Sequence, residues 1–599
     1  MRTSRDIRVT MSDTIKTTLA AAVEGLLGLR DPGAGWTGRL SSSALSTATA
    51  VTALGCVDRK AHEHLISAGH KWLARHVNAD GGWGDTPQSK SNLPTTLLAW
   101  SALGGEHSDV VAAAERWLIA RTGSLEPKRI AGALADIYGA DRTFSAPILT
   151  MCAISGRLGN GPESWGLVAP LPFELAVLPS WTFSFLGLPV VSYALPALIA
   201  IGQARHFHRP SRNPAVRLVR NISRNRVLKK LRAIQPAGGG FLEAAPLTSF
   251  VAMSLASAGL SDHPVTTGCV GFLKDTVRAD GSWPIDTNLS TWVTTLSVSA
   301  LSAGSPLGDE DARAVADWLI ARQQTEVHPY TRAAPGGWAW SPLSGAVPDA
   351  DDTAGAMIAL HHLARGDARA AGAAATGAKW LTDLQNRDGG IPTFCRGWGK
   401  LPFDRSCADL TAHALGAWGV WRDDFEGVLA ARVRRASARA VEYLAREQRD
   451  DGSWRPLWFG NEDSPDQSNP TYGTARVLLG LCQAGVDIPP EMLSRGAEWL
   501  VSAQNDDGGW GGDASIASSI EETALALDAL LCVGDARGAI ESGAAWLVEN
   551  TDGGRKFPPS AIGLYFAKLW YYEELYPRIF TVSALNRFLA KRNSIPENH

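Results

Sequence analysis

The chain has 599 residues, a formal net charge of −3 and 45% hydrophobic residues. This composition is typical of a globular protein and argues against a disordered or fibrous chain. The balanced charge provides no overall basic field for nucleic acid, so we expect no nucleic-acid partner. Its 7 cysteines are scattered and include no C-x-x-C pair, which predicts neither a disulfide framework nor a zinc knuckle.

The first residues, MRTSRDIRVTMSDTIK, are partly basic and contain no apolar stretch, so they predict no secretion signal. The long segments that follow are rich in Ala and Leu at helical spacing. Ala and Leu favour helix, and strand signals are nearly absent. We therefore expect an all-α protein.

One phrase recurs along the chain: the end of an amphipathic helix, an Asn/Asp-Gly turn, and a tryptophan. Glycine suits such turns because it adopts positive φ without strain. Copies about 50 residues apart predict stacked helix pairs, and we expect the tryptophans and three glutamines to tie neighbouring helices together. The tryptophans of complete copies are Trp83, Trp283, Trp454 and Trp510, Ile391 replaces the tryptophan in another copy, and the glutamines are Gln385, Gln448 and Gln504.

The copies fall in both halves of the chain, which predicts two helical domains. We place the first at residues 17–295 and the second at residues 296–599, with residues 1–16 packing on the second. The copies lack obvious polar capping repeats, which favours closed rings over an open solenoid.

Within the first domain, residues 168–201 form the most apolar run of the chain, yet they include five prolines, so a straight membrane-spanning helix is not expected. Residues 205–232 then contain ten Lys/Arg and no Asp/Glu. An apolar face beside a basic stretch is suited to one leaflet of a membrane with anionic lipids. The alternative is a buried helix followed by a solvated basic loop.

In the second domain, the stretch GAVPDADDTAGAMIAL places Asp349, Asp351 and Asp352 at the start of an expected helix. Asp351 or Asp352 at the N-cap would explain one or two of these acids. Crowded carboxylates cannot all ionise, so one stays protonated at neutral pH. A protonated carboxyl can protonate a weak base such as an alkene where water is excluded.

Together, the Gly-Trp phrases and DADDTA resemble the QW motifs and the D-x-D-D-T-A motif of squalene–hopene cyclases, which are class II terpene cyclases. The resemblance covers nearly the whole chain and is strongest from Trp283 to Pro577. It implies two α/α-barrel domains, including an α6–α6 toroid, that enclose an apolar cavity. It implies no metal and no cofactor.

The resemblance also implies individual roles. Asp351 corresponds to the proton donor, with Asp349 and Asp352 supporting it. In CADLTAHALGAW, Asp409 and His413 share one helical face, and His413 corresponds to the histidine that pairs with the donor. Tyr472, in NPTYGT, corresponds to a tyrosine that helps return a proton to the donor.

Protonation of an alkene leaves a carbocation, which aromatic faces stabilise without attacking it. Any single aromatic residue at helical spacing is as well explained by core packing, but the set favours a cavity wall. The residues expected to line the cavity and stabilise cations are Trp292, Trp340, Phe394, Trp458, Phe557, Tyr565 and Tyr572.

The chain also departs from the family pattern. Where the family carries a glutamate of the proton relay, this sequence has Thr47 or Thr49 and no acid nearby. A family tryptophan is replaced around Pro189, and residues 461–470 form a polar insertion. These changes bear on the substrate and on the number of rings formed.

The resemblance implies proton-initiated cyclisation of a linear isoprenoid, foremost squalene to a cyclic triterpene such as hopene, at the cytoplasmic side of a membrane as a monotopic protein. A shorter polyprenoid or prenyl diphosphate is the alternative substrate, and a lipid-binding relative is the non-enzymatic alternative. A metal-dependent class I mechanism is disfavoured because Asp423-Asp424 is followed by Phe-Glu-Gly and not by a D-D-x-x-D motif. A prenyltransferase subunit would need a zinc set, and a carbohydrate-active barrel would need two separated carboxylates in a polar cleft. A homodimer is left open.

Overall fold

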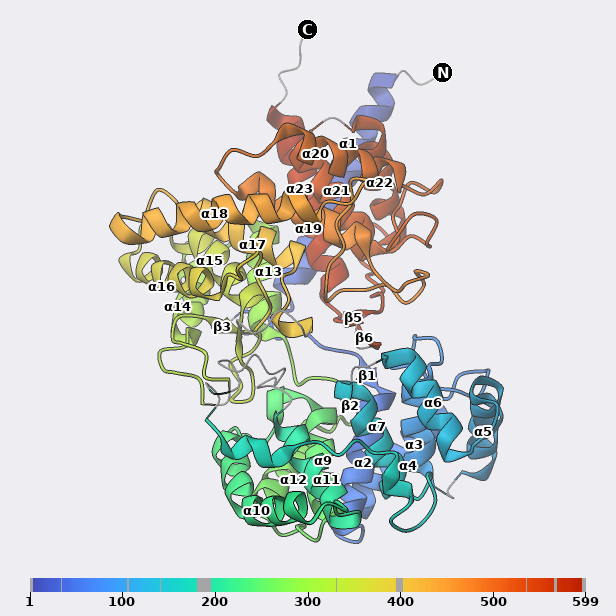
Figure 1. Cartoon of the computed structure of the whole chain (residues 1–599). Helices are drawn as coiled ribbons and strands as arrows, with labels where there is room; N and C mark the ends of the chain where they lie inside the picture. The colour runs from blue at the N-terminus through green and yellow to red at the C-terminus, as the bar shows by residue number, and fades with distance from the viewer. Residues whose placement is uncertain are drawn as a thin grey trace.

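The computed structural model describes residues 4–33, 35–104, 107–139, 142–179, 182, 195–329, 331–394, 402–534, 536–564 and 568–594. The described chain is almost entirely helical and forms two lobes, each built on a ring of helices (Figure 1). The expected all-α class is confirmed.

The second domain is a closed double ring. Its inner helices contact each other in sequence order, and the last contacts the first. They are α13 (Ser290–Ser302), α15 (Ala350–Ala364), α17 (Ala408–Val420), α19 (Pro470–Gln483), α21 (Ile520–Val533) and α23 (Tyr576–Ser594). The outer helices are α14 (Asp309–Arg322), α16 (Ala368–Leu384), α18 (Gly427–Glu447), α20 (Pro490–Ser502), α22 (Arg537–Asn550) and α1 (Ser4–Leu27).

The first domain repeats this plan with a smaller ring. The inner helices that the structure describes are α2 (Ala44–Asp58), α4 (Leu93–Leu103), α7 (Arg142–Ile154), α9 (Leu195–His208) and α11 (Ala245–Ser257), and α11 closes the ring against α2. Outside them lie α3 (Glu63–Arg75), α5 (Ser108–Thr122), α6 (Pro127–Tyr138), α10 (Pro214–Ile234) and α12 (Pro264–Thr276). No helix in the described ranges combines the length and apolarity that crossing a bilayer requires.

Short connectors complete the fold. Three two-stranded ribbons pair β1 (Ser42–Ser43) with β2 (Trp283–Pro284), β3 (Trp338–Ala339) with β4 (Pro348–Asp349), and β5 (Ile562–Leu564) with β6 (Leu569–Tyr571). Single 3-10 turns occur at Ser164–Gly166, Phe173–Val177, Phe241–Glu243 and Pro402–Asp404.

The inner and outer helices differ in which residues they bury. On α18 the buried side chains follow one face: Val433, Ala436, Ser437, Ala440, Tyr443 and Leu444. This spacing of three and four residues is that of a surface helix. On α15, by contrast, nearly every residue from Ala350 to Leu360 is buried, because an inner helix contacts protein on all sides.

The tryptophans and glutamines tie the helices together as expected. Trp454 Nε1 donates to the carbonyl of Leu444, 2.8 Å away, and its backbone N–H donates to Thr474 Oγ1 on the next inner helix. Gln448 Nε2 donates to the carbonyls of Gly452 and Met492. The same two hydrogen bonds of the tryptophan, from its indole N–H and its backbone N–H, are made by Trp83, Trp283 and Trp510. The same two side-chain bonds of the glutamine are made by Gln385 and Gln504.

The hydrophobic cores divide the chain differently from the boundary expected at residue 295. That boundary falls inside α13, whose buried residues Trp292, Val293 and Leu296 belong to the core of the second domain. The N-terminal helix α1 belongs there too, because Ile15 and residues after it join the same core beside α22 and α23. Residues 17–27 are therefore part of the second domain's outer ring.

Candidate active site

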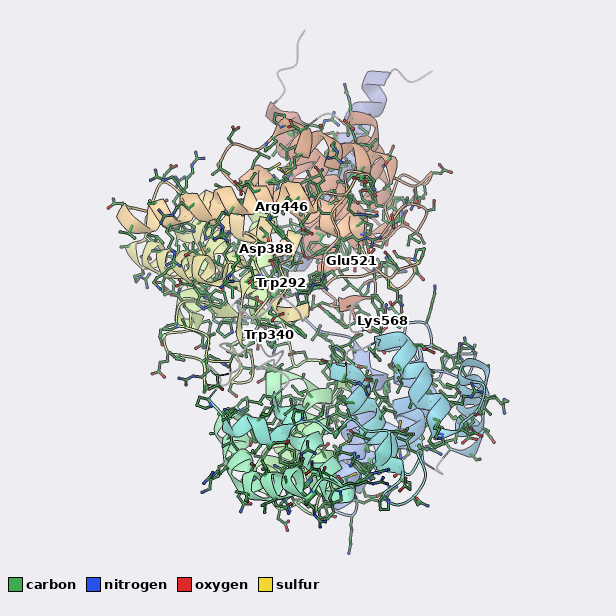
Figure 2. The ribbon with its side chains drawn as sticks, viewed as in Figure 1. Trp292, Trp340, Asp388, Arg446, Glu521 and Lys568 are labelled. Carbon is green, nitrogen blue, oxygen red and sulfur yellow. The ribbon has the colours of Figure 1, made fainter. Side chains whose placement is uncertain are left out.

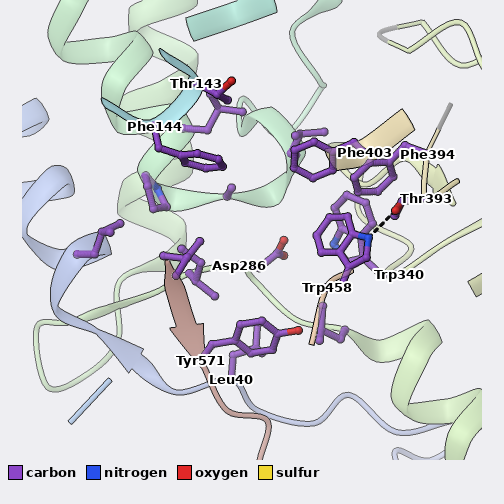
Figure 3. A pocket seen from close by; sticks show the side chains of 18 of the residues that line it. Leu40, Thr143, Phe144, Asp286, Trp340, Thr393, Phe394, Phe403, Trp458 and Tyr571 are labelled. Carbon is purple, nitrogen blue, oxygen red and sulfur yellow. Dashed lines mark hydrogen bonds between the residues drawn. The ribbon is translucent and has the colours of Figure 1, made fainter. Parts of the chain in front are cut away.

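A cavity of about 370 Å³ lies where the two barrels meet, and both contribute to its wall. Figure 2 shows Trp292, Trp340 and Lys568, three of its lining residues, close to the junction of the lobes. Figure 3 gives the wall from nearby, with Phe144 of α7 opposite Tyr571 of β6. Most lining side chains are aliphatic or aromatic, and this size and character suit a small apolar ligand.

The three aspartates lie at the N-terminus of α15, and all of them line the cavity. Asp349, not Asp351 or Asp352, is the N-cap: its Oδ1 accepts a hydrogen bond of 2.8 Å from the backbone N–H of Asp352. The prediction that Asp351 or Asp352 is the N-cap was wrong. The backbone of Asp349 is extended and pairs with Trp338 in a ribbon, and the helix begins at the next residue. Asp351 and Asp352 therefore occupy the first turn, where the helix dipole favours negative charge.

Asp351 pairs with His413 of α17. His413 Nδ1 lies 2.5 Å from Asp351 Oδ1, and both side chains are largely buried, with exposed fractions of 11% and 17%. Burial lowers the pKa of His413, and the neighbouring Asp351 opposes this shift. Asp409, one helical turn before His413, is also buried. Burial raises the pKa of Asp409 to about 6, with Asp351 adding to the shift, while the Cys407 thiol that donates to it has the opposite effect.

Asp349 and Asp352 are almost fully buried and share a crowded site. Asp349 Oδ2 and Asp352 Oδ1 are both buried without a hydrogen-bond partner. Burial raises the pKa of Asp349 to about 7, and the charge of Asp351 adds to this shift. Burial, followed by the charge of Asp349, raises the pKa of Asp352 well above its usual range. The cluster therefore retains protons at neutral pH, which is the condition for an acid catalyst.

An aromatic cluster forms one side of the cavity. Phe394 has its ring centroid 5.5 Å from that of Trp458, 5.4 Å from that of Phe403 and 5.9 Å from that of Trp340. The indole N–H of Trp458 donates to Thr393 Oγ1, which fixes the ring (Figure 3). Trp292, on α13, packs edge-on against His413 at 5.9 Å and also lines the cavity.

Tyr472, at the start of α19, lies behind the wall. Its ring centroid is 4.5 Å from that of Phe459, which does line the cavity. Burial raises the pKa of the Tyr472 hydroxyl well above its usual range, and the charges of Asp351 and Asp409 contribute to this shift. The hydroxyl is thus neutral and within electrostatic reach of the acid cluster.

Three of the expected cavity aromatics are not among the lining residues that the structure describes. Phe557 packs beneath the guanidinium of Arg578, 4.6 Å from its ring centroid. Tyr572 is half-buried at the end of β6, where its backbone N–H donates to Ser41 Oγ. Tyr565 lies outside the described residues.

Tyr571 occupies the wall in place of Tyr572. Side chains alternate between the two faces of a strand, so a shift of one residue exchanges the faces. Leu569 and Tyr571 face the cavity, while Trp570 between them is buried on the other side. The sequence contains both tyrosines side by side, and only the pairing of β5 with β6 decides between them.

Four further lining residues had no distinguishing signal in the sequence: Phe144, Asp286, Phe403 and Tyr576. Asp286 is the notable one, because it is an acid away from the three aspartates. Lys568 is the one basic side chain among the described lining residues. No group of three or more His, Cys, Asp or Glu that could hold a metal ion occurs within the described ranges.

Comparison with known proteins supports this description. Residues 289–590 match the family model of the squalene–hopene cyclase C-terminal domain, and residues 19–135 match that of the N-terminal domain. The squalene–hopene cyclase of Bradyrhizobium diazoefficiens is 24% identical over 99% of this chain and 97% of its own. That of Alicyclobacillus acidocaldarius is 27% identical over 82% of this chain and 92% of its own.

Two further similarities are informative in different ways. The enfumafungin synthase of Hormonema carpetanum is 26% identical over 92% of this chain, which spans about half (46%) of that longer protein. The ent-copalyl diphosphate synthase of Streptomyces platensis shares the fold, with a TM-score of 0.56 at 21% identity over 97% of this chain and all of its own. With the family models matching more than half of the residues, the chain belongs to the squalene–hopene cyclase family of class II terpene cyclases.

Proposed function

We propose that the protein cyclises a linear isoprenoid by adding a proton to an alkene, with Asp351 as the proton donor. The observation that carries this proposal is Asp351 in the wall of an apolar and aromatic cavity, with His413 Nδ1 2.5 Å from its Oδ1. Asp349 and Asp352 keep the site rich in protons because burial disfavours their ionised forms.

The first step moves the Asp351 proton to one carbon of the terminal double bond. The π electrons form the new C–H bond, which leaves a cation on the neighbouring carbon and a carboxylate on Asp351. His413 and the N-terminus of α15 stabilise that carboxylate once the proton has left. Tyr472 and Asp409 then support the return of a proton to Asp351.

The cation next reacts with the remaining double bonds of the folded chain, and each attack forms a ring and moves the positive charge. A desolvated aromatic face stabilises a cation by ~0.5 to 2 kcal/mol. Trp292 is placed for the first cation because it packs against His413, and Trp340, Phe394 and Trp458 are placed for later ones. Loss of a proton or addition of water ends the sequence.

Squalene, converted to a cyclic triterpene such as hopene, is the foremost substrate we propose. Support comes from the matched squalene–hopene cyclases, two of which align over most of their own length. A shorter polyprenoid or a prenyl diphosphate is the alternative.

Product analysis tests this function. Purified protein in detergent is incubated with squalene, and products are identified by gas chromatography and mass spectrometry. The unmodified protein is expected to form a cyclic product, and Asp351→Asn is expected to form none. Asp423→Asn, at an exposed position of the α17–α18 connection, is the matched control and should retain full activity. Cyclic product formed at an undiminished rate by Asp351→Asn would refute the assignment of the donor.

We also propose that the first domain sits on one leaflet of a membrane. On α10, Leu218, Val219 and Ile222 are 59%, 51% and 61% exposed. The same helix exposes Arg217, Arg226 and Lys229, so apolar and basic groups share a surface. Flotation with vesicles containing anionic lipid tests this: Leu218→Asp with Ile222→Asp should abolish binding, whereas binding unchanged by both substitutions would contradict the proposal.

A further inference from the structure

Two cysteines lie at the end of the second barrel that is opposite the cavity. Cys482 is in the last turn of α19 and Cys532 in the last turn of α21, and these helices are neighbours in the inner ring (Figure 1). The cavity-lining residues of this ring, among them Trp292, Asp351 and Tyr576, come instead from the first turns of their helices. The cysteine pair is therefore separate from the proposed active site.

The two thiols contact each other. The S–H of Cys482 donates a hydrogen bond to the sulfur of Cys532. Both are free thiols, and both reach solvent, since Cys482 is exposed and Cys532 is partly exposed. A disulfide requires its two sulfurs to approach to about 2 Å. Thiols in contact need only a small movement to reach that distance, and the exposed side chain of Cys482 has room to make it.

Two cations of α23 lie beside Cys532. Lys591 Nζ donates to the backbone carbonyl of the preceding residue at 2.8 Å, and Arg587 pairs with Asp528, one helical turn before Cys532. The hydrogen bond from Cys482 lowers the pKa of the Cys532 thiol, and the two cations add to this effect. Burial and the charge of Asp528 act in the opposite direction. Because the thiolate is the form that attacks a disulfide, Cys532 is the nucleophilic member of the pair.

The other cysteines that the structure describes are poorly placed for such chemistry. Cys152, Cys269 and Cys407 are buried, and burial raises the pKa of each thiol. Burial also raises the pKa of Cys56, to about 11, so this thiol keeps its proton. A protonated thiol is a poor nucleophile, and a buried one is out of reach of an oxidant. Within the described ranges, the reactive thiols are those of the pair.

We propose that Cys482 and Cys532 form a reversible disulfide, which joins α19 to α21, by exchange with a low-molecular-weight disulfide. The Cys532 thiolate attacks one sulfur of the oxidant, which gives a mixed disulfide and releases one thiolate. Cys482 loses its proton, bonds to the sulfur of Cys532 and displaces the second thiolate. The released thiolates take up the two cysteine protons. Two protein thiols are thereby oxidised to one disulfide, and the oxidant is reduced to two thiols.

The new bond acts as a staple between two helices of the inner ring. The two cysteines are about 50 residues apart in the chain, so the bond closes a long loop and lowers the entropy of the unfolded protein. We therefore expect the oxidised protein to melt several degrees above the reduced one. The inference is independent of the proposed cyclase function, because its test measures no turnover.

The test begins with the unmodified protein, reduced and then freed of reductant. It is incubated with oxidised glutathione, and peptides of a non-reducing digest are identified by mass spectrometry. We expect peptides joined through Cys482 and Cys532, and a raised melting temperature, both reversed by dithiothreitol. Cys482→Ser retains a hydrogen-bond donor but lacks the second thiol, so it should keep glutathione on Cys532 and acquire it there about 10-fold faster than on Cys56. Cys56→Ser is the matched control and should form the bond as the unmodified protein does.

Several results would overturn the inference. One is a digest without this cross-link at every ratio of oxidised to reduced glutathione, including the case in which glutathione stays on Cys532 and the ring does not close. Others are a cross-link that uses a different cysteine equally fast, modification of Cys56 as fast as that of Cys532, or a melting temperature that the bond leaves unchanged. The cross-link is measured in the unmodified protein, so the test stands even if a serine variant does not fold.

Discussion

Replacing His413 with leucine is expected to slow proton transfer and leave the fold intact. His413 Nδ1 is 2.5 Å from Asp351 Oδ1, and both side chains are largely buried. Water therefore does not readily take the place of the imidazole in the leucine variant. A hydrogen bond to a charged group contributes about 1.5–3 kcal/mol. The full charge on Asp351 exists only after the proton has begun to leave, so the loss falls on the transition state. This corresponds to a decrease in kcat of roughly 10- to 150-fold.

His413→Asn is the matched variant, because the asparagine amide places an N–H the same number of bonds from the backbone as Nδ1 of histidine. It should recover most of the lost rate. Initial rates are measured by mass spectrometry of the cyclic product at saturating substrate, and thermal melting checks that all proteins are folded. The reasoning would be refuted by a leucine variant as fast as the unmodified protein, or by an asparagine variant as slow as the leucine one.

Other predictions follow from single contacts. Burial raises the pKa of Asp349 to about 7, so ionisation of this carboxyl destabilises the folded state. The melting temperature of Asp349→Asn minus that of the unmodified protein should therefore increase as the pH rises from about 4 to about 7. A difference that stays constant over this range would contradict the reasoning. Trp292→Leu should be roughly 2- to 30-fold slower in product formation than Trp292→Phe if the ring stabilises a cation. Gln448→Ala removes one hydrogen bond to Met492 of the neighbouring helix α20 and one to the turn residue Gly452, and should lower the free energy of unfolding by about 1–3 kcal/mol, measured by denaturant titration. Tyr571→Phe should change the product pattern, and Tyr572→Phe should not; the opposite result would contradict the register of β6.

The features predictable from the sequence are those in which local rules set the structure. Asp349, Asp351 and Asp352 are close because they fall within four residues at a helix start, and the tryptophan phrases recur because each repeat needs the same bonds. His413 lies far from the aspartates in sequence, and only the family resemblance connected them. The structure places His413 beside Asp351 because α15 and α17 are neighbours in the inner ring.

What could not be predicted depends on tertiary pairing. The choice between Tyr571 and Tyr572 is a matter of one residue in strand register. Asp286 is unremarkable in the sequence, since a single aspartate near a helix start is usually a cap or a solvated residue. Its position in the cavity follows from the bridge to Ala244, a contact across more than one helix of the first domain. The domain boundary differs from the expected one because α1 packs against α22 and α23, and α13 against α23, and these partners lie at the far end of the chain.

The acid cluster itself can be understood as a modified copy of the structural repeat. In DADDTA, Thr353 Oγ1 accepts from the backbone N–H of Trp338 and donates to the carbonyl of Asp349. Thr523 Oγ1 accepts from the backbone N–H of Trp510 in the same way. There the N-cap is Ser519, and Glu521 and Glu522 occupy the positions of Asp351 and Asp352.

The two acid pairs share their local geometry and differ in what faces them. Glu522 accepts from the side-chain amides of Asn461 and Asn469, and Glu521 accepts from the backbone N–H of Ser560, so both have protein partners away from the cavity. Asp351 instead faces His413 and the cavity. The repeat thus supplies a buried, dipole-stabilised acid pair at more than one helix start. The proposed catalytic role belongs to the pair whose remaining face is open to an apolar ligand, because only there can a proton leave the protein.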